Sequence, residues 1–387
     1  MKKQKKTASD QPGRTTLDDV AAHAGVSRST ASLVVRNSAL IPPETHKRVR
    51  ASMTALSYVY NHSAANLRTK KTKILGMIIA DMSNPFYGIL ASGIEKACHE
   101  REYVTIFADT GESAGRQKLI INRLIEHNVA GVFLCPAGEA TKMDMRALDA
   151  VGIPAVLIMR YLQSYPASYV GPDNIKGARL AVDHLVSLGH RRIGMIGGPA
   201  ARSSSIDRVR GFRDGMAAHG LAVEEAMVAA SEIDRGSAME VALKFLSHRK
   251  PPTAIFCYND VMAFGVMLAV LKLGLQPGRD LAVVGFDDIP ESQLWTPPLT
   301  TIAIDPRNIG QLAANELLKR IDNPSTPNRS IVVEPRLVIR ESCGEAFAFR
   351  GKKRPADESV VAKRVDHGRP SKKGRRQRPG AVSEPGA

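Results

Sequence analysis

Residues 16–32 read Thr-Leu-Asp-Asp-Val-Ala-Ala-His-Ala-Gly-Val-Ser-Arg-Ser-Thr-Ala-Ser, and this stretch decides the fold of the N-terminal part of the chain. Thr16 and Asp19 have the spacing of a helix capping pair. Gly25 suits a tight turn, and Ser27 suits the cap of a second helix. The first helix is indicated by apolar residues at the i, i+3, i+4, i+7 spacing of one helix face, which are Leu17, Val20, Ala21 and Ala24.

Two further helices are predicted from the residues that follow. In the second helix, Ala31, Val34 and Val35 are expected to face inward. A third helix is predicted from about residue 43 to residue 56, with a proline in its first turn. Pro42 precedes it where a capping side chain is usual, which costs about 1 kcal/mol. The outward-facing residues of the second helix are expected to be Arg28, Ser29, Ser32, Leu33 and Arg36. Together these helices predict a helix-turn-helix domain over residues 15–60.

The distribution of charge along the 387 residues indicates a polyanion as partner. Residues 1–73 hold 14 Lys and Arg against 4 Asp and Glu, net +10, and residues 344–387 hold 12 against 5, net +7. The whole chain carries +16, so the middle is close to neutral. Basic ends on a neutral body favour contact with nucleic acid phosphates. For the C-terminal tail, a merely solubilising role is an equal alternative.

The two ends and the cysteines complete the compositional picture. Residues 1–14 and 344–387 are polar, basic and without periodicity, so we expect a disordered arm and a disordered tail. No apolar stretch is long enough to span a membrane, and no apolar signal segment follows the basic residues among positions 2–6. We therefore expect a cytoplasmic protein. The four cysteines are dispersed, so neither a metal site nor a disulfide framework is expected. We expect no cofactor.

From residue 74 onward, short apolar runs alternate with helical stretches, which is typical of parallel sheets with helices on both faces. Predicted strands include residues 74–80, 104–108 and 131–135. About 270 residues of this pattern exceed one ordinary sheet core, so two α/β lobes are expected over residues 74–343. The chain contains no phosphate-binding loop motif, and we expect no enzymatic activity. Asp287 and Asp288 should point to opposite sides of their strand end.

Several motifs, in a fixed order, carry a resemblance to the lactose/galactose repressor family over residues 15–343. Residues 16–32 resemble the DNA-reading segment of that family, and residues 56–68 (Leu-Ser-Tyr-Val-Tyr-Asn-His-Ser-Ala-Ala-Asn-Leu-Arg) resemble its hinge. The downstream motifs are Asn84-Pro-Phe-Tyr, Leu188-Gly-His-Arg-Arg-Ile, Arg208-Val-Arg-Gly-Phe, Tyr258-Asn-Asp, Gly285-Phe-Asp-Asp and Pro297-Pro-Leu-Thr-Thr-Ile. The resemblance implies a periplasmic-binding-protein-like effector domain. Its first lobe would comprise about 74–170 and 304–333, and its second about 171–303 and 334–343.

The resemblance also implies a homodimeric transcriptional repressor that binds a palindromic DNA operator under the control of a small-molecule effector. Residues 61–73 would form a hinge helix and linker. Asn61 would contact phosphate, and Ala64 and Leu67 would enter the minor groove. A flexible basic linker is the alternative reading of this segment. No leucine heptads follow Cys343, so no zipper-made tetramer is expected.

The second helix of a helix-turn-helix lies in the major groove with its N-terminal residues against base edges. Arg28 is expected to bind a guanine and Leu33 a thymine methyl, with Ser29 as a third base-reading residue. Leu33 and Arg36 stand where the family usually has other residue types, so operator preference does not transfer. Short hydroxyl side chains are expected at phosphates, with helix capping as the alternative: Thr16, Ser27, Thr30 and Ser32.

A cleft between two α/β lobes is where open sheets bind ligands. The family resemblance implies that the first lobe contributes Asn84, Phe86 and Tyr87 to this cleft. The second lobe would contribute Arg208, Asn259 and Asp287. An aromatic platform with Arg, Asn and Asp suits a polyhydroxylated ligand such as a sugar. Helix packing is the alternative for the aromatic pair, and a lobe-bridging ion pair is the alternative for Arg208 and Asp287. Weaker candidates are Asp81, Arg160 and Asp173.

Two other classes of function are compatible with parts of the sequence. One is a sugar-binding protein or carbohydrate enzyme that uses the same lobes. The other is a non-specific DNA-binding protein of the nucleoid, whose affinity would depend on salt but not on DNA sequence. The six cleft residues argue against the second class, because such a protein needs no lobed cleft.

Overall fold

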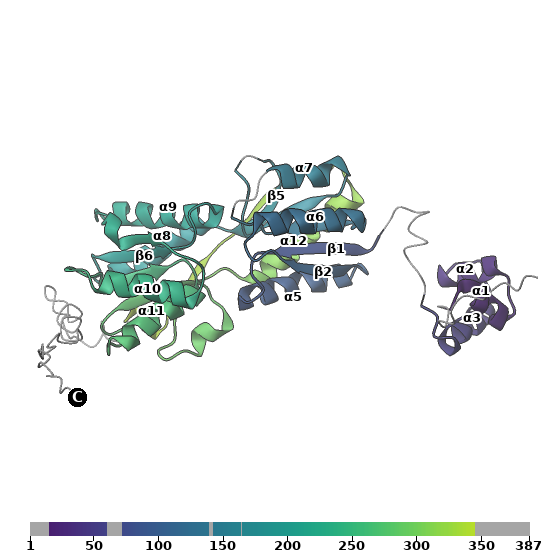
Figure 1. Cartoon of the computed structure of the whole chain (residues 1–387), viewed down its shortest axis with the longest axis horizontal. Helices are drawn as coiled ribbons and strands as arrows, with labels where there is room; N and C mark the ends of the chain where they lie inside the picture. Colours follow the sequence, from purple (N-terminus) through teal and green to yellow (C-terminus); the bar gives the residue numbers. More distant parts are fainter. Residues whose placement is uncertain (1–14, 60–71, 139–141, 164, 345–387) are drawn as a thin grey trace, which may run out of the picture. The chain divides into compact units, whose positions relative to one another are not determined.

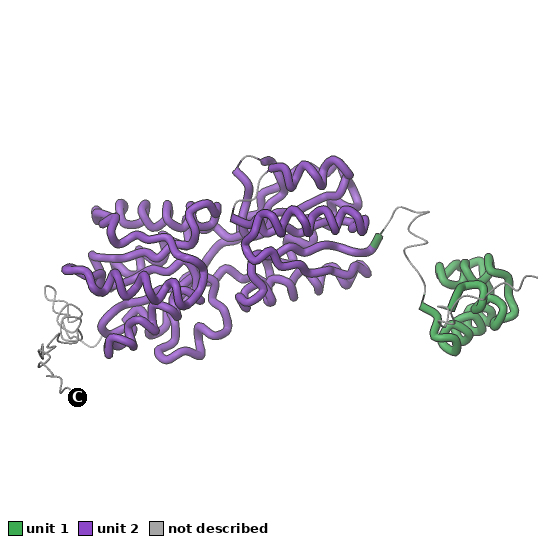
Figure 2. The backbone as a smooth tube through the Cα atoms, viewed as in Figure 1, with its two compact units in different colours: residues 1–72 green, residues 73–387 purple. Residues whose placement is uncertain are grey.

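The computed structural model describes residues 15–59, 72–138, 142–163 and 165–344. The chain divides into two compact units, residues 1–72 and 73–387, which are described separately (Figure 2). The predicted arm at 1–14, residues 61–71 of the predicted hinge and residues 345–387 of the predicted tail lie outside the described residues. Within the described ranges, no helix is long and apolar enough to cross a membrane. These ranges also contain no cluster of three or more His, Cys, Asp or Glu side chains that could hold a metal ion.

The first unit contains three short helices, α1 (Leu17–Ala24), α2 (Arg28–Val35) and α3 (Pro43–Ala55). The hydroxyl of Thr16 accepts a hydrogen bond from the backbone N–H of Asp19, whose carboxylate accepts one from the backbone N–H of Thr16. Gly25 ends α1 in the left-handed conformation. Six buried side chains pack the three helices together: Val20, Ala21, Ala24, Ala31, Val34 and Val49. These features explain why so short a segment has a core of its own.

Two details of this unit bear on the sequence predictions. Val35 was expected to face inward with Val34, but it is only half-buried. It is the last residue of α2, where the helix leaves the three-helix core. Pro42 gives α3 no side-chain capping bond, as predicted.

The first lobe of the second unit is a parallel sheet of six strands in the order β11-β5-β4-β3-β1-β2. Side chains alternate along β1, so Met77 packs against one layer of helices and Ile78 against the other. Helices α5 (Pro85–His99) and α12 (Pro306–Asp322) cover one face, and α6 (Ala114–Glu126) and α7 (Lys142–Ala150) cover the other (Figure 1). The strands are β1 (Ile74–Ile79), β2 (Val104–Asp109), β3 (Gly131–Leu134), β4 (Ala155–Ile158), β5 (Ser168–Pro172) and β11 (Ser330–Val333).

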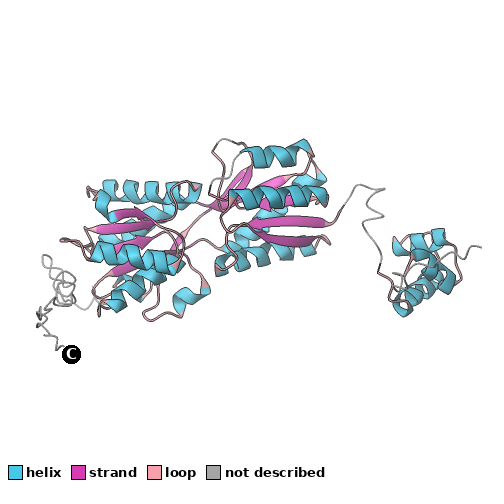
Figure 3. Cartoon of the chain, in the orientation of Figure 1, coloured by secondary structure: helices cyan, strands magenta, loops and turns pink. Residues whose placement is uncertain are grey.

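The second lobe has the same plan, with strands between layers of helices (Figure 3). Its strand order is β12-β10-β9-β8-β6-β7. The sheet is parallel as predicted except at its edge, where β12 runs antiparallel to β10. The strands are β6 (Ile193–Gly197), β7 (Val228–Ala230), β8 (Ala254–Cys257), β9 (Ala282–Asp287), β10 (Thr300–Ala303) and β12 (Arg336–Val338). The helices are α8 (Asn174–Ser187), α9 (Ser203–Ala218), α10 (Arg235–Leu246) and α11 (Asp260–Lys272), with short 3-10 turns η1 (Glu225–Met227), η2 (Pro290–Gln293) and η3 (Glu341–Cys343).

The chain crosses between the lobes at three places, after β5, after β10 and after β11. The last of these crossings explains the direction of β12. β11 is parallel to β5 in the first sheet, and only two residues separate it from β12 in the second. So short a connection cannot turn the chain back, so β12 continues in the direction in which β11 leaves the first lobe, which is opposite to the direction of β10.

Helices α5 and α12 meet through two glycines. A Cβ atom at Gly93 would lie 2.1 Å from the carbonyl oxygen of Arg307, and one at Gly310 would lie 2.3 Å from the carbonyl oxygen of Leu90. The backbones are therefore in direct contact, and neither position accepts a side chain without moving a helix.

We predict that Gly93→Ala lowers the free energy of unfolding by about 1–3 kcal/mol, because the new methyl group overpacks this backbone contact. Chemical denaturation measures the change. Gly88→Ala is the matched control in the same helix, since a Cβ at Gly88 meets nothing within 4 Å. It should be neutral or slightly stabilising, because alanine favours a helix over glycine. Equal effects of the two substitutions would contradict the described contact.

Candidate DNA-contacting surface and interlobe cavity

The N-terminus of α2 presents the predicted DNA-contacting side chains. Arg28 and Ser29 are exposed, and Leu33 is half-buried. The hydroxyl of Ser27 accepts a hydrogen bond from the backbone N–H of Thr30 at 3.1 Å. Its Oγ also lies 2.8 Å from the side-chain oxygens of Ser29 and of Thr30. Ser27 therefore caps the helix and orders its first turn, a role compatible with a phosphate contact.

Two arginines, Arg28 at the start of α2 and Arg36 at its C-cap, have partners within the first unit. Arg28 Nε lies 3.1 Å from Asp18 Oδ1 of α1, and both side chains are largely exposed. Such a pair contributes little to stability and is readily exchanged for another acceptor. Arg36 donates a hydrogen bond to the hydroxyl of Ser32 at 2.9 Å. Among the other predicted DNA contacts, Thr16 caps α1, and Asn61, Ala64 and Leu67 lie outside the described residues.

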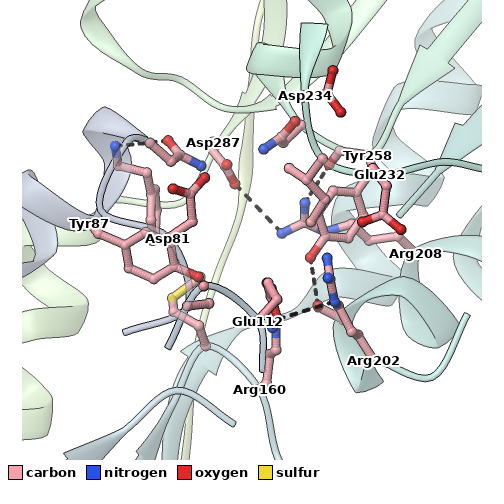
Figure 4. A pocket seen from close by; sticks show the side chains of 18 residues that line it. Asp81, Tyr87, Glu112, Arg160, Arg202, Arg208, Glu232, Asp234, Tyr258 and Asp287 are labelled. Atoms are coloured by element: carbon pink, nitrogen blue, oxygen red, sulfur yellow. Dashed lines mark hydrogen bonds and ion pairs between the residues drawn. The ribbon is translucent and has the colours of Figure 1, made fainter. Parts of the chain in front are cut away.

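A cavity of about 270 Å³ lies between the two lobes of the second unit (Figure 4). All six predicted effector residues line it: Asn84, Phe86, Tyr87, Arg208, Asn259 and Asp287. Asp81 and Arg160 line it too. Asp173 does not, because its carboxylate caps α8 by accepting a hydrogen bond from the backbone N–H of Lys176 at 2.9 Å. The cavity is therefore built from strand ends and helix starts of both lobes.

Phe86 and Tyr87 lie in the first turn of α5, after the capping Asn84. Their rings pack edge to face with centroids 5.4 Å apart, and both side chains are buried. The Tyr87 hydroxyl lies 3.5 Å from the Cys135 thiol, and burial raises the pKa of Tyr87 well above its ordinary value. The aromatic pair therefore combines helix packing with a wall of the cavity.

Arg208 of α9 is held from several sides. Its Nε donates to Asn174 Oδ1 at 2.8 Å, and its Nη1 donates to the backbone carbonyl of Tyr258. The guanidinium carbon lies 3.6 Å from the centroid of the Phe286 ring. Nη2 lies 3.6 Å from Asp287 Oδ1. Arg208 and Asp287 both belong to the second lobe, so this ion pair does not bridge the lobes, contrary to the alternative considered from sequence.

Asp287 ends β9 with a φ of 113° and is buried. Burial raises its pKa to about 8, although the neighbouring Arg208 acts to lower it. The next residue, Asp288, binds Arg340 at 2.7 Å instead. The two carboxylates therefore point to different partners, as the sequence predicted, and do not form a pair around one substrate atom.

Among the cavity residues that sequence reasoning missed are Glu112 and Arg202. Glu112 lies in the loop after β2, in the left-handed conformation. Its carboxylate accepts two hydrogen bonds from Arg160, at 2.9 and 2.8 Å, and lies 3.4 Å from Arg202 Nε of the second lobe. Glu112 thus connects the two lobes through two buried arginines. The signal available in the sequence was the position of Glu112 just after a predicted strand, because strand ends line such clefts.

Comparison with known proteins agrees with this architecture. Residues 16–61 match the family model "Bacterial regulatory proteins, lacI family", and residues 182–343 match "Periplasmic binding protein-like domain". The chain is 30% identical to the ribose operon repressor of Haemophilus influenzae over 84% of this chain and 98% of the relative. It is 31% identical to the HTH-type transcriptional repressor PurR of Photobacterium profundum, with the same coverage.

Solved structures point the same way. The Lac repressor dimer bound to operator and the anti-inducer ONPF matches with a TM-score of 0.77 at 26% identity, over 86% of this chain and 99% of that chain. A CelR–cellobiose complex matches with a TM-score of 0.66 at 29% identity, over 85% of this chain and 100% of that chain. Fold and site together define a DNA-binding regulator of transcription with a ligand-binding domain. The chain belongs to the LacI family of bacterial regulatory proteins.

We predict that Asp287→Asn changes how stability depends on pH. The folded-state pKa of Asp287, about 8, exceeds the ordinary value of 3.8, so its contribution to stability is full below pH 4 and is lost as pH rises to about 8. From pH 5.5 to 8, wild-type unfolding free energy should therefore fall relative to Asp287→Asn, by at most about 1.4 kcal/mol per pH unit. Denaturant unfolding at several pH values measures this.

The variant provides its own control for other titrating groups. Burial also raises the pKa of the nearby Asp260, to about 7, and that group is present in both proteins. Asparagine keeps the shape of the side chain and tolerates a positive φ. Parallel stability curves for the two proteins would show that Asp287 is already ionised at pH 5.5.

Proposed function

We propose that this protein is a homodimeric repressor that binds a palindromic operator and responds to a small metabolite, a sugar or a related compound, in the interlobe cavity. The observation that carries the proposal is that side chains from both lobes line one cavity in a chain that also has a helix-turn-helix unit. It acts as a regulator and not as an enzyme, in the cytoplasm and on the nucleoid when operator-bound.

Operator reading is assigned to the start of α2. Arg28 binds a guanine edge through its guanidinium, with Ser29 beside it and Leu33 against a thymine methyl. The exposure of Arg28 and its weak pairing with Asp18 support this, since DNA has only to replace a solvated carboxylate. Phosphates are bound by the short polar side chains Thr16, Ser27, Thr30, Ser32 and Asn61, and the minor groove by Ala64 and Leu67.

Effector control follows from ligand contacts in both lobes. A ligand that touches Asn84 and Tyr87 in one lobe and Asn259 and Asp287 in the other favours one relative position of the lobes. Only a difference in affinity between two arrangements shifts their populations. A ligand that prefers the DNA-bound arrangement is therefore a corepressor, and one that prefers the other arrangement is an inducer.

Dimerisation is assigned to the edge of the first sheet. The edge strand β2 exposes Val104, Ile106 and Phe107 within six residues. Exposed apolar side chains on a free strand edge favour pairing with another protein surface. In a homodimer this edge would contact the same edge of the second copy around a twofold axis.

We predict that Arg28→Ala removes base preference at one position of each operator half-site, because a bidentate arginine–guanine contact discriminates by about 1–3 kcal/mol. Selection from a random DNA library at ~0.15 M salt measures it. Arg213→Ala is the control, since it removes the same charge from the second lobe. A chain that ends at Cys343 should keep the motif. Binding that follows salt and tail length without any motif would contradict operator reading.

We predict that Ile106→Lys weakens the homodimer at least tenfold, because it places a charge in an apolar contact. Sedimentation equilibrium measures the dissociation constant. Val332→Lys is the matched control, because Val332 is exposed to a similar extent, 53% against 45% for Ile106, on β11, the opposite edge strand of the same sheet. The assignment of β2 is wrong if the two variants dissociate to the same extent.

A further inference from the structure

The interior of the interlobe cavity carries an excess of positive charge. Three arginines that line it, Arg160, Arg202 and Arg208, have side chains only 5, 4 and 3% exposed. Two carboxylates face them: Glu112 is 22% exposed and Asp287 is 8% exposed. Guanidinium groups stay charged even when buried. The arginines therefore outnumber the carboxylates when Asp287 is ionised, and by more when its raised pKa keeps it protonated.

Other acidic groups lie nearer the solvent. Glu232 and Asp234 line the cavity but are exposed, and Asp81 is half-buried and accepts two hydrogen bonds from Ser83. Water and salt screen such exposed charges much more strongly than buried ones. They therefore do not balance the arginines in the interior.

The three arginines differ in how well their donors are satisfied. Arg208 has a side-chain amide, a backbone carbonyl and a carboxylate as partners. Arg160 has both oxygens of Glu112 and the carbonyl of Pro136. Arg202 has only the shared Glu112, 3.4 Å from its Nε, and its Nε and Nη1 are buried without a hydrogen-bond partner. Burying a charged donor without a hydrogen-bond acceptor costs folding free energy. Arg202 therefore has room for a further acceptor.

Arg202 is also the N-cap residue of α9, a helix of 16 residues. No side chain caps this helix start, and its first turn, Ser203-Ser204-Ser205, holds no acidic residue. Ser204 lines the cavity. The backbone N–H groups and the dipole at a helix start favour an anion. The uncapped helix start and the unsatisfied guanidinium therefore both line the cavity, and both favour a negatively charged ligand group.

We propose that the effector is a sugar derivative with an anionic group, a carboxylate or a phosphate, which binds to Arg202 and the N-terminus of α9. This rests on the proposed function, in which the cavity is the effector site. The cavity volume of about 270 Å³ is below the ~300–1,000 Å³ typical of sites for drug-sized ligands, so the ligand is about the size of one sugar unit. Asn84 and Asn259 also line the cavity; their Oδ1 atoms cap α5 and α11, and their side-chain N–H groups can donate to hydroxyl groups of the ligand.

The test compares matched sets of ligands with the full-length protein. Each set holds a neutral sugar, its aldonate or uronate and its monophosphate, for example D-glucose, D-gluconate and D-glucose 6-phosphate. Isothermal titration calorimetry measures each dissociation constant at fixed salt. We expect an anionic member of at least one set to bind ten or more times more tightly than its neutral parent, as charge-assisted hydrogen bonds do. Whichever derivative binds more tightly, the sugar acid or the sugar phosphate, identifies the anionic group as a carboxylate or a phosphate.

Variants link that preference to Arg202. Arg202→Gln should weaken the anionic ligand about tenfold or more and leave the neutral sugar unchanged, while Arg202→Lys should keep part of the preference. Arg210→Gln is the matched control, because Arg210 belongs to the same helix and is exposed. Thermal unfolding of each variant verifies that it is folded.

Three outcomes would overturn the proposal: no anionic member binds, a neutral sugar binds as tightly as its anionic derivatives, or Arg202→Gln leaves the anion's affinity unchanged. Tight binding of a neutral sugar would support the cavity as the effector site but would exclude an anionic group as the feature that the site recognises. Operator selection by the same protein is independent of both results, so failure of the regulatory function would be seen separately.

Discussion

The constraint on which the site depends is that parallel strands end at the same edge of their sheet. The lobes share three crossings of the chain, and the residues that line the cavity follow strand ends in both. Asp81 follows β1, Arg160 follows β4 and Asn259 follows β8, while Asp287 ends β9. A ligand between these edges is surrounded by side chains whose positions are fixed by buried strands.

The strand ends and the loops that follow them also bring charged side chains together in the buried interior of the cavity. Arg160 and Arg202 come from different lobes and share Glu112, so each lobe supplies part of the electrostatic environment of the other. Removing Glu112 would leave two buried guanidinium groups without their carboxylate, which is strongly destabilising. The relative position of the lobes and the charge of the cavity are therefore linked, and a bound ligand acts on both.

The sequence predicted what depends on local patterns. The capping pair of Thr16 and Asp19, the three short helices and the α/β alternation all follow from spacing and residue type, and family motifs indicated six residues that line the cavity. Glu112 and Arg202 were missed, because their importance arises from a loop conformation and a pairing of residues far apart in the chain. The antiparallel β12 was missed for a similar reason, since it depends on a short crossing between lobes.

The glycine contact between α5 and α12 has a mechanical consequence. α12 begins directly after one of the three crossings, and α5 begins at the cavity with Asn84, Phe86 and Tyr87. A joint between helices made of backbone atoms is stiffer than one made of flexible side chains, because it has no rotamers to change. Any displacement of α5 at the cavity would therefore be passed to α12, next to the crossing between the lobes.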